Sequence, residues 1–357
     1  MSPRGLLVAG AFAMLGLLAT GAAAAPPDPV IFATVSSFDR NYAPMFVARE
    51  LGYFAKENID VQVVNFEGAT ALLPQLAANR VTLGFPNAEP VILSRDVGKP
   101  SLPVKYFYNV LRSNTWEFAV PETSPIRTLQ DLKGKRIGIF GLSSGNLPIT
   151  KAILADAGLR ESDYDLVPVG LGGPALLALE SNKVDAMNLF MIFDDQAAAS
   201  GVHLRLLPVP KRFGQFVSNG FAANVDTIRD HADLLVRFAR AIAKGTIACQ
   251  NNFAGCMRTM WKYSPTMKPP NLSDADALKM SERAFYREVA QVSVAPPGHY
   301  GEYNPAMWTA FVSALHEGGL LSTTAIPADS LFTNALIHDI NAFDYAAVVH
   351  DAARLPS

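Results

Sequence analysis

The feature that most constrains this chain is an order of strand-like and helix-like segments that occurs twice. Residues 31–35 and 136–140 are short apolar runs, and each leads into a loop and then a helix-like segment closed by glycine. Further on, residues 73–82 align without a gap with residues 176–185, and both pass from a helical pattern through Asn and a basic residue into a Val-led strand. The identities are few, so a chance match between generic segments is the alternative. Alternating strands and helices are typical of parallel sheets, and the repeat predicts two similar α/β lobes.

The two lobes are predicted to be joined by two extended crossings. Residues 106–116 are apolar and aromatic enough to form a strand that leaves the first lobe, and residues 216–224 have the pattern of a strand that returns to it. Two such crossings form a two-strand hinge, which permits closure about a cleft but restrains free tumbling of the lobes. We therefore place lobe 1 at residues 29–115 plus 223–345 and lobe 2 at residues 116–222.

Residues 1–24 have the features of a secretory signal peptide. Arg4 precedes an apolar run from residue 6 to residue 19, and small residues follow as far as Ala24, after which we expect cleavage. A membrane anchor is the weaker alternative, because the apolar run is short for a membrane span. We therefore expect export. In the whole chain of 357 residues the formal net charge is -2, which offers no basic face for nucleic acid.

The chain has two cysteines, Cys249 and Cys256. Export would place them in an oxidising compartment. On one continuous helix, residues seven apart would lie about 10 Å apart along the axis, which is too far for a disulfide. Residues 251–255, however, contain two Asn and one Gly and have the composition of a break between two helices. We predict a disulfide across that corner, with two buried thiols as the alternative.

A loop of small and polar residues follows the strand at residues 136–140. Residues 141–145 read Gly-Leu-Ser-Ser-Gly, which matches the G-x-S-x-G nucleophile elbow of hydrolases, in the strand-to-helix context that this motif requires. The other interpretation is a loop that holds a ligand without chemistry. The N–H groups of a helix N-terminus, with two hydroxyl groups, can bind a small polar ligand at the carboxyl end of a strand.

Three segments of the chain resemble a known family. Residues 44–54 (PMFVARELGYF), 129–138 (LQDLKGKRIG) and 179–186 (LESNKVDA) are similar to signature segments of the periplasmic solute-binding proteins of ABC importers. The most similar group includes binders of nitrate, sulfonates, taurine and thiamine pyrimidine precursors. Each motif is weak alone, whereas three in the right order and spacing are specific for the family and silent on the ligand.

This resemblance implies an α/β, two-lobed periplasmic-binding-protein fold of the type II-like kind, in which each lobe is a mostly parallel sheet flanked by helices. It implies a monomer in the periplasm that holds a small molecule between its lobes and delivers it to the membrane permease of an ABC transporter. It also implies a binding protein rather than an enzyme. We expect no cofactor and no metal, since the sequence contains no His-Glu-x-x-His, Cys-x-x-Cys or acidic calcium-loop motif.

Candidate ligand-binding residues lie in the loops at the carboxyl ends of the strands, where open α/β sheets bind ligands. Each candidate has a structural alternative: Ser143, Asn146 and Asp194 could cap helices, and Phe190 could belong to the core. The first lobe offers Phe38, Asn41, Tyr42, Glu67, Thr70, Asn87 and Glu89. The second lobe offers Trp116, Ser143, Ser144, Asn146, Asn188, Phe190 and Asp194, with Asn219 on the return crossing.

The chemistry of these candidates favours one ligand class over another. An oxyanion would suit the N–H groups of the Gly/Ser loop, but Arg40 is the one cation near the candidate loops. Glu89 and Asp194 favour a ligand with amine or ring N–H donors, and the aromatic candidates favour a flat ring. We therefore expect a nitrogenous heterocycle similar to a thiamine precursor, with a sulfonate or an aromatic acid as the alternative.

A secreted serine esterase is the alternative function. It would use Ser143 as nucleophile, a later carboxylate such as Asp194, and a later histidine, and every histidine of the chain follows Ser143. Against it, no His-Gly-Gly segment precedes Ser143, Pro148 crowds the start of the helix, and duplicated lobes do not fit a single hydrolase sheet. An enzyme of thiamine pyrimidine synthesis on the same fold is a second alternative, but the chain has no Cys cluster and is predicted to be exported.

Overall fold

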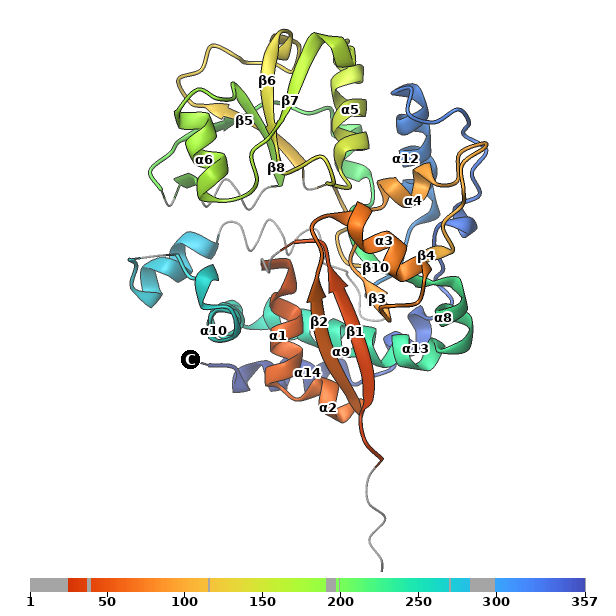
Figure 1. Cartoon of the computed structure of the whole chain (residues 1–357). Coiled ribbons are helices and arrows are strands. Elements are labelled where there is room, and N and C mark those ends of the chain that lie inside the picture. Colours follow the sequence, from red (N-terminus) through yellow and green to blue (C-terminus); the bar gives the residue numbers. More distant parts are fainter. Residues whose placement is uncertain are drawn as a thin grey trace, which may run out of the picture.

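The chain forms two α/β lobes, which lie one above the other in Figure 1. The predicted signal peptide lies outside the described residues. Within the described residues, no helix has both the length and the apolar character that a membrane span requires. The computed structural model describes residues 25–36, 40–114, 116–190, 197–198, 200–269, 271–282 and 299–356.

Lobe one, the lower lobe in Figure 1, is built on a five-stranded sheet with the order β2-β1-β3-β10-β4. The first three strands in that order are parallel, and β10 runs antiparallel to both of its neighbours. The strands are β1 (Asp28–Thr34), β2 (Ile59–Asn65), β3 (Leu83–Gly84), β4 (Val104–Asn109) and β10 (Gly220–Asn224). The helical elements are η1 (Arg40–Tyr42), α1 (Ala43–Glu50), α2 (Tyr53–Lys56), α3 (Ala69–Ala77), α4 (Glu89–Leu93), α8 (Val225–Asp230), α9 (Ala232–Asn251), α10 (Phe253–Tyr263), α13 (Ile337–Ile340) and α14 (Tyr345–Asp351).

Lobe two has the same arrangement, with the strand order β7-β6-β8-β5-β9. Again three strands are parallel and the last two pairings are antiparallel. The sheets are therefore mixed, because the fourth strand of each sheet enters from the other lobe: β5 follows lobe one in sequence, and β10 follows lobe two. The elements are β5 (Trp116–Pro121), β6 (Lys135–Ile139), α5 (Leu147–Asp156), β7 (Tyr164–Pro168), α6 (Gly173–Glu180), β8 (Ala186–Phe190) and β9 (Leu204–Leu206).

The predicted repeat is confirmed at the level of the backbone. Asn79 and Asn182, which align in sequence, both adopt the left-handed conformation, with φ values of 54° and 55°. The residue after each donates its N–H to the carbonyl at the aligned position of the preceding helix, Gln75 in one lobe and Ala178 in the other, at 2.9 Å. Because Asn tolerates this conformation better than most residues, it ends both helices and turns the chain into the next strand.

The two crossings between the lobes are hydrogen-bonded to each other. The N–H of Leu111 donates to the carbonyl of Asn219 at 3.0 Å, and the N–H of Ser218 donates to the carbonyl of Leu111 at 3.2 Å. The lobes are thus joined by two paired, extended segments. By sheet membership, the whole of β10 belongs to lobe one, because Gly220 already pairs with Asn109.

The lobes are also linked through the helix α12 (Pro305–Glu317), which lies beside α5 at the right of Figure 1. On its lobe-two side, Phe311 stacks on Phe216 with ring centroids 4.9 Å apart. Arg212 bonds to Glu317 at the end of α12 at 2.6 Å and to Asp156 at the end of α5. The helix therefore packs against lobe two, although its sequence position falls in the range predicted for lobe one.

The predicted disulfide is confirmed. Cys249 near the end of α9 is bonded to Cys256 in α10, with Cα atoms 4.9 Å apart. Asn252 separates the two helices, and its side chain accepts a hydrogen bond from the N–H of Gly255 at 2.9 Å. This N-cap starts a new helix axis, which brings two residues seven positions apart close enough to bridge.

Candidate functional site

A cleft lies between the two lobes, where the parallel strands of both sheets end. Both lobes and both crossings contribute to its walls. Seven of the residues predicted from the sequence line it: Asn41, Tyr42, Asn87, Trp116, Ser144, Phe190 and Asn219.

Two asparagines form the wall of the cleft near the return crossing. The side-chain amide of Asn87 donates to Oδ1 of Asn219 at 3.2 Å, and the amide of Asn219 donates to the carbonyl of Phe85 at 3.1 Å. Behind them, the hydroxyl of Tyr106 donates to the carbonyl of Asn87 at 2.5 Å. Asn87 and Asn219 are 4% and 9% exposed, so these bonds fix their orientation before any ligand binds.

On the lobe-two side, Ser144 is held by a buried polar network. Its hydroxyl donates to Oδ1 of Asn146, and the amide of Asn146 donates to Oδ1 of Asn188 at 3.2 Å. Thr150 donates its hydroxyl to the same oxygen of Asn188 at 2.6 Å. Asn146 and Asn188 are buried and lie behind the wall, so they position Ser144 instead of lining the cleft. The side chain of Asn146 makes no capping bond at the start of α5.

Aromatic rings face the cleft from both lobes. In lobe two, Trp116 and Phe190 pair directly across β5 and β8, with ring centroids 5.6 Å apart and planes at 77°. In lobe one, Tyr42 and Phe85 form a second edge-to-face pair, with centroids at 5.6 Å. The indole Nε1 of Trp116 is buried and has no hydrogen-bond partner in the described part of the chain. A ligand with an acceptor atom could pair with it.

The lobes touch directly beside the cleft. The hydroxyl of Thr70 in α3 donates to the carbonyl of Ser143 at 3.0 Å. A Cβ atom on Gly68 would lie 2.4 Å from the same carbonyl oxygen, and one on Gly145 would lie 2.7 Å from Oδ1 of Asn87. Thr70 and Ser143, two of the predicted site residues, therefore join the lobes and do not line the cleft.

Two of the three predicted acidic residues, Glu67 and Glu89, do not reach the cleft. Glu67 is exposed on the loop before α3, and Glu89 at the start of α4 is 3% exposed and lies outside the cleft lining. Burial raises the pKa of Glu89 to about 8, because the charged carboxylate is poorly solvated there. Within the residues that the structure describes, its Oε2 has no hydrogen-bond partner. The predicted residues Phe38 and Asp194 lie outside the described residues.

Several lining residues were missed by the sequence prediction. Phe85 and Phe140 immediately follow strands β3 and β6, and Val35 and Ser36 follow β1. The rule that placed candidates in loops could have found them if the residues next to each strand had been included. The missed glycine and leucine residues have no polar or aromatic side chain that would have marked them as candidates. The other missed residues are Gly68, Leu111, Gly145 and Leu171.

The arrangement does not resemble a hydrolase triad. Among the described residues, the lining of the cleft includes no histidine. His299 pairs instead with Glu302 at 2.5 Å, and His316 bonds to the carbonyl of Leu321 at 2.8 Å. In the described part of the chain, no group of three or more His, Cys, Asp or Glu side chains is placed to hold a metal ion.

Two lobes of this topology, joined by paired crossings around a cleft, define the fold of the periplasmic solute-binding proteins. The alkanesulfonate-binding protein SsuA from Xanthomonas axonopodis pv. citri, solved with bound MOPS, has this fold. It superposes with a TM-score of 0.64 at 18% sequence identity and covers 87% of this chain and 100% of that chain. Within this class, the chain belongs to the NMT1/THI5-like family, which matches residues 39–253.

Curated relatives include both a binding protein and an enzyme. The riboflavin-binding protein RibY of Chloroflexus aurantiacus is 24% identical over 301 residues, which are 83% of this chain and 82% of that protein. The 4-amino-5-hydroxymethyl-2-methylpyrimidine phosphate synthase of Uromyces fabae is 24% identical over 242 residues, 64% of this chain and 69% of the synthase. Family membership alone therefore does not choose between binding and catalysis.

Proposed function

We propose that this chain is an exported solute-binding protein that captures a small, neutral nitrogen heterocycle between its lobes and delivers it to the permease of an ABC importer. One observation carries the proposal. The described lining of the cleft consists of amide, hydroxyl and aromatic groups from both lobes, and it contains no charged side chain.

The absence of charge in this described lining argues against an oxyanion. Burying an anion is costly unless cations or several N–H groups replace its water. Arg40, the cation nearest to the candidate loops, lines a neighbouring pocket of lobe one and is not part of the cleft lining. A sulfonate or an aromatic acid is therefore the less favoured ligand, although the similar protein SsuA is named for alkanesulfonates.

The groups that are present suit a heterocycle. The amides of Asn41, Asn87 and Asn219 each offer both donors and acceptors, which match ring nitrogens and ring N–H groups. Trp116 adds a buried indole N–H, and the aromatic pairs on both sides can contact a flat ring. Because Glu89 is buried away from the cleft, the preference for a heterocycle now rests on the amides instead of on carboxylates. RibY and the synthase are both named for nitrogen heterocycles.

Capture would proceed by a closure equilibrium. A ligand that contacts both lobes favours the shut form, in which the loop of Gly68 meets the loop of Ser143. Micromolar affinity, about 8 kcal/mol at the standard state, would suit a protein that must release its ligand again. We propose that the ligand leaves chemically unchanged, that the chain acts as a monomer, and that residues 1–24 direct it to the periplasm.

Titration calorimetry on the chain beginning after Ala24 tests the proposal. The probes are 4-amino-5-hydroxymethyl-2-methylpyrimidine, riboflavin and methanesulfonate. We expect at least one heterocycle to bind, and we expect Trp116→Phe, which keeps a ring but removes the N–H, to weaken that binding about tenfold. Trp261→Phe is the matched control, because Trp261 lies in α10 and lines neither pocket.

Three outcomes would contradict the proposal. Heat released with methanesulfonate alone would assign the cleft to an anion, and equal affinity of both tryptophan variants would remove Trp116 from the site. Mass spectrometry of the recovered heterocycle checks the third point, because a chemically altered product would show an enzyme.

A further inference from the structure

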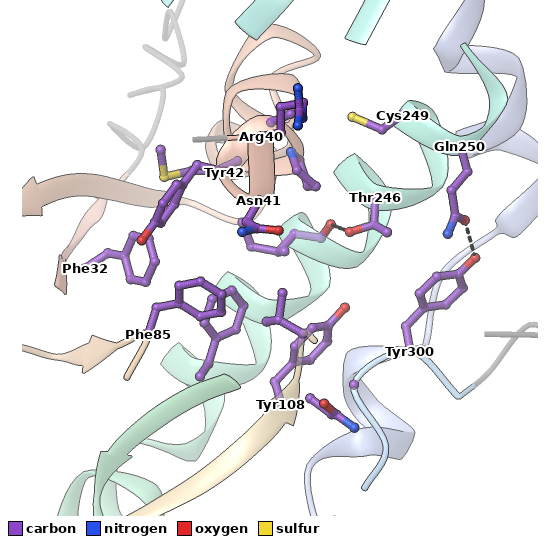
Figure 2. Close-up of a pocket in the computed structure, with 18 residues that line it drawn as sticks. Phe32, Arg40, Asn41, Tyr42, Phe85, Tyr108, Thr246, Cys249, Gln250 and Tyr300 are labelled. Carbon is purple, nitrogen blue, oxygen red and sulfur yellow. Dashed lines mark hydrogen bonds between the residues drawn. The ribbon is translucent and has the colours of Figure 1, made fainter. Parts of the chain in front are cut away.

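A second pocket lies within lobe one, immediately beside the cleft. We call it the lobe-one pocket, and Figure 2 shows its side chains. Asn41, Tyr42 and Phe85 line both this pocket and the cleft, so the two spaces share one wall. The pocket is therefore a candidate second compartment of the same binding site.

One side of the lobe-one pocket is a rigid cluster of aromatic rings. Phe221 is packed between Phe32 and Tyr108, with ring centroids at 5.6 Å and 5.3 Å. Gly301 lies against Tyr108 so closely that a Cβ atom there would be 2.1 Å from a ring carbon. The carbonyl of Gly301 also accepts a hydrogen bond from the N–H of Asn109 at 2.8 Å. The segment at Gly301 thus holds the ring of Tyr108 in place, so this wall of the pocket is formed before any ligand binds.

The opposite side of the lobe-one pocket comes from one face of α9. Four residues of α9 line it: Ile242, Thr246, Cys249 and Gln250. The last three follow Ile242 by four, seven and eight positions, which is the spacing of residues on one face of a helix. In Figure 2, Thr246 and Gln250 lie across the pocket from Phe32 and Phe85. The side chain of Arg40 points away from the aromatic rings in the same view.

Two buried polar atoms of this lining have no hydrogen-bond partner among the described residues. The hydroxyl of Tyr300 donates to Oε1 of Gln250 at 3.0 Å, which leaves the donor Nε2 of Gln250 unpaired. The amide of Asn109 donates to the carbonyl of Glu302 at 3.4 Å, which leaves the acceptor Oδ1 of Asn109 unpaired. An unpaired buried polar atom is costly, so a ligand that pairs with either atom gains affinity.

We propose that the lobe-one pocket binds a neutral planar ring that carries one hydrogen-bond acceptor and one donor. The ligand then has two parts: a hydrogen-bonding part in the cleft and a ring part between the aromatic wall and α9. This inference rests on the proposed function, because it takes the ligand of the cleft to reach past Tyr42 and Phe85. The ring's acceptor pairs with Gln250 Nε2, or its donor pairs with Asn109 Oδ1.

Titration of the chain beginning after Ala24 with quinazolin-4-one tests the pocket separately from the cleft. This probe is a neutral bicyclic lactam with one ring N–H and one carbonyl group. We expect calorimetry to show that the probe binds with millimolar affinity. We expect this affinity to fall at least tenfold in Thr246→Phe, because the added ring fills the pocket. Thr309→Phe is the matched control, since Thr309 is exposed on α12.

Gln250→Leu is the milder variant, in case the added phenyl ring disturbs the fold. It removes the unpaired donor while keeping similar volume, and we expect it to weaken the probe about fivefold to tenfold. Asn251→Leu, at the exposed neighbouring position, should leave the affinity unchanged. Thermal unfolding of all four variants shows which of them remain folded.

Comparison of the pocket variants with their matched controls decides the proposal. Loss of binding in Thr246→Phe and Gln250→Leu, with binding retained in Thr309→Phe and Asn251→Leu, supports it. No binding to the parent chain, or equal binding to the pocket variants and their controls, overturns it. Neither result depends on the pyrimidine and sulfonate titrations, so failure of this inference and failure of the proposed function can be told apart.

Discussion

Glu89 is a carboxylic acid buried at the start of α4, and its Oε2 finds no hydrogen-bond partner among the residues described. Burial raises its pKa to about 8 from a usual value of 4.5. The folded chain therefore keeps this proton at pH values where the unfolded chain has lost it. The stabilising effect of the proton is fully present below about pH 4.5 and is lost as the pH rises through about 8.

Glu89→Gln tests this effect, because an amide has no charge to bury at any pH. The free energy of unfolding of the parent chain should fall between pH 5 and pH 8, and this fall should become smaller in the variant by at least about 1 kcal/mol. Urea denaturation at both pH values measures it. Glu67→Gln, at an exposed position, is the control, and a parent-like pH slope in Glu89→Gln would contradict the burial argument.

At the scale of elements, the repeat gives a matched pair of positions. Asn79 and Asn182 have the same left-handed backbone, but their side chains differ in what they bind. The hydroxyl of Thr227 donates to Oδ1 of Asn79 at 2.9 Å, and both asparagines lie at exposed positions. The two asparagines therefore share a backbone role, and Asn79 alone also accepts from Thr227 in α8.

Glycine at each position separates these two roles. Glycine adopts positive φ freely, so Asn182→Gly should change the free energy of unfolding by only a few tenths of a kcal/mol. Asn79→Gly should destabilise by about 1 kcal/mol more, because the hydroxyl of Thr227 loses its acceptor. Urea denaturation of the two variants measures the difference. Equal values would show that the bond to Thr227 contributes nothing to stability.

The sequence predicted the elements whose signals are local. Three such signals are confirmed: the ten-residue segments of the repeat, the asparagine turns, and the helix break between Cys249 and Cys256. The predicted strand at residues 106–116 is instead two strands, β4 and β5, separated by the crossing. No glycine or proline marks that division, because pairing with β10 on one side and β8 on the other decides it.

The candidate site was predictable only as far as strand ends allow. That rule placed Asn87 and Trp116 at the cleft, but it could not tell them from Asn188, which follows the same pattern and points into lobe two. Which way such a side chain points depends on tertiary packing. The same rule could not predict the lobe-one pocket. Part of its lining depends on the contact between Gly301 and Asn109, which lie far apart in the sequence.

At the scale of the whole molecule, the lobes can shut only where their loops fit together. Gly145 in lobe two approaches Asn87 and Ala69 in lobe one, where a Cβ atom would lie 2.7 Å from Asn87 Oδ1 and 3.0 Å from Ala69 Cβ. A Cβ atom added to Gly141, in the same loop, would lie 3.9 Å from Oγ of Ser143, which is an ordinary van der Waals distance. Gly141 and Gly145 are both described, and neither has a positive φ, so alanine at either position does not strain the backbone.

Gly145→Ala should therefore hinder closure without disturbing either lobe. We expect the affinity for the heterocycle that the parent chain binds to fall at least tenfold, since each lobe keeps its own contacts but the shut form costs more than about 1.4 kcal/mol extra. Gly141→Ala should bind as the parent does. Small-angle scattering, with and without ligand, shows whether the chain compacts on binding. Compaction and affinity equal to the parent in Gly145→Ala would mean that capture does not depend on these loops meeting.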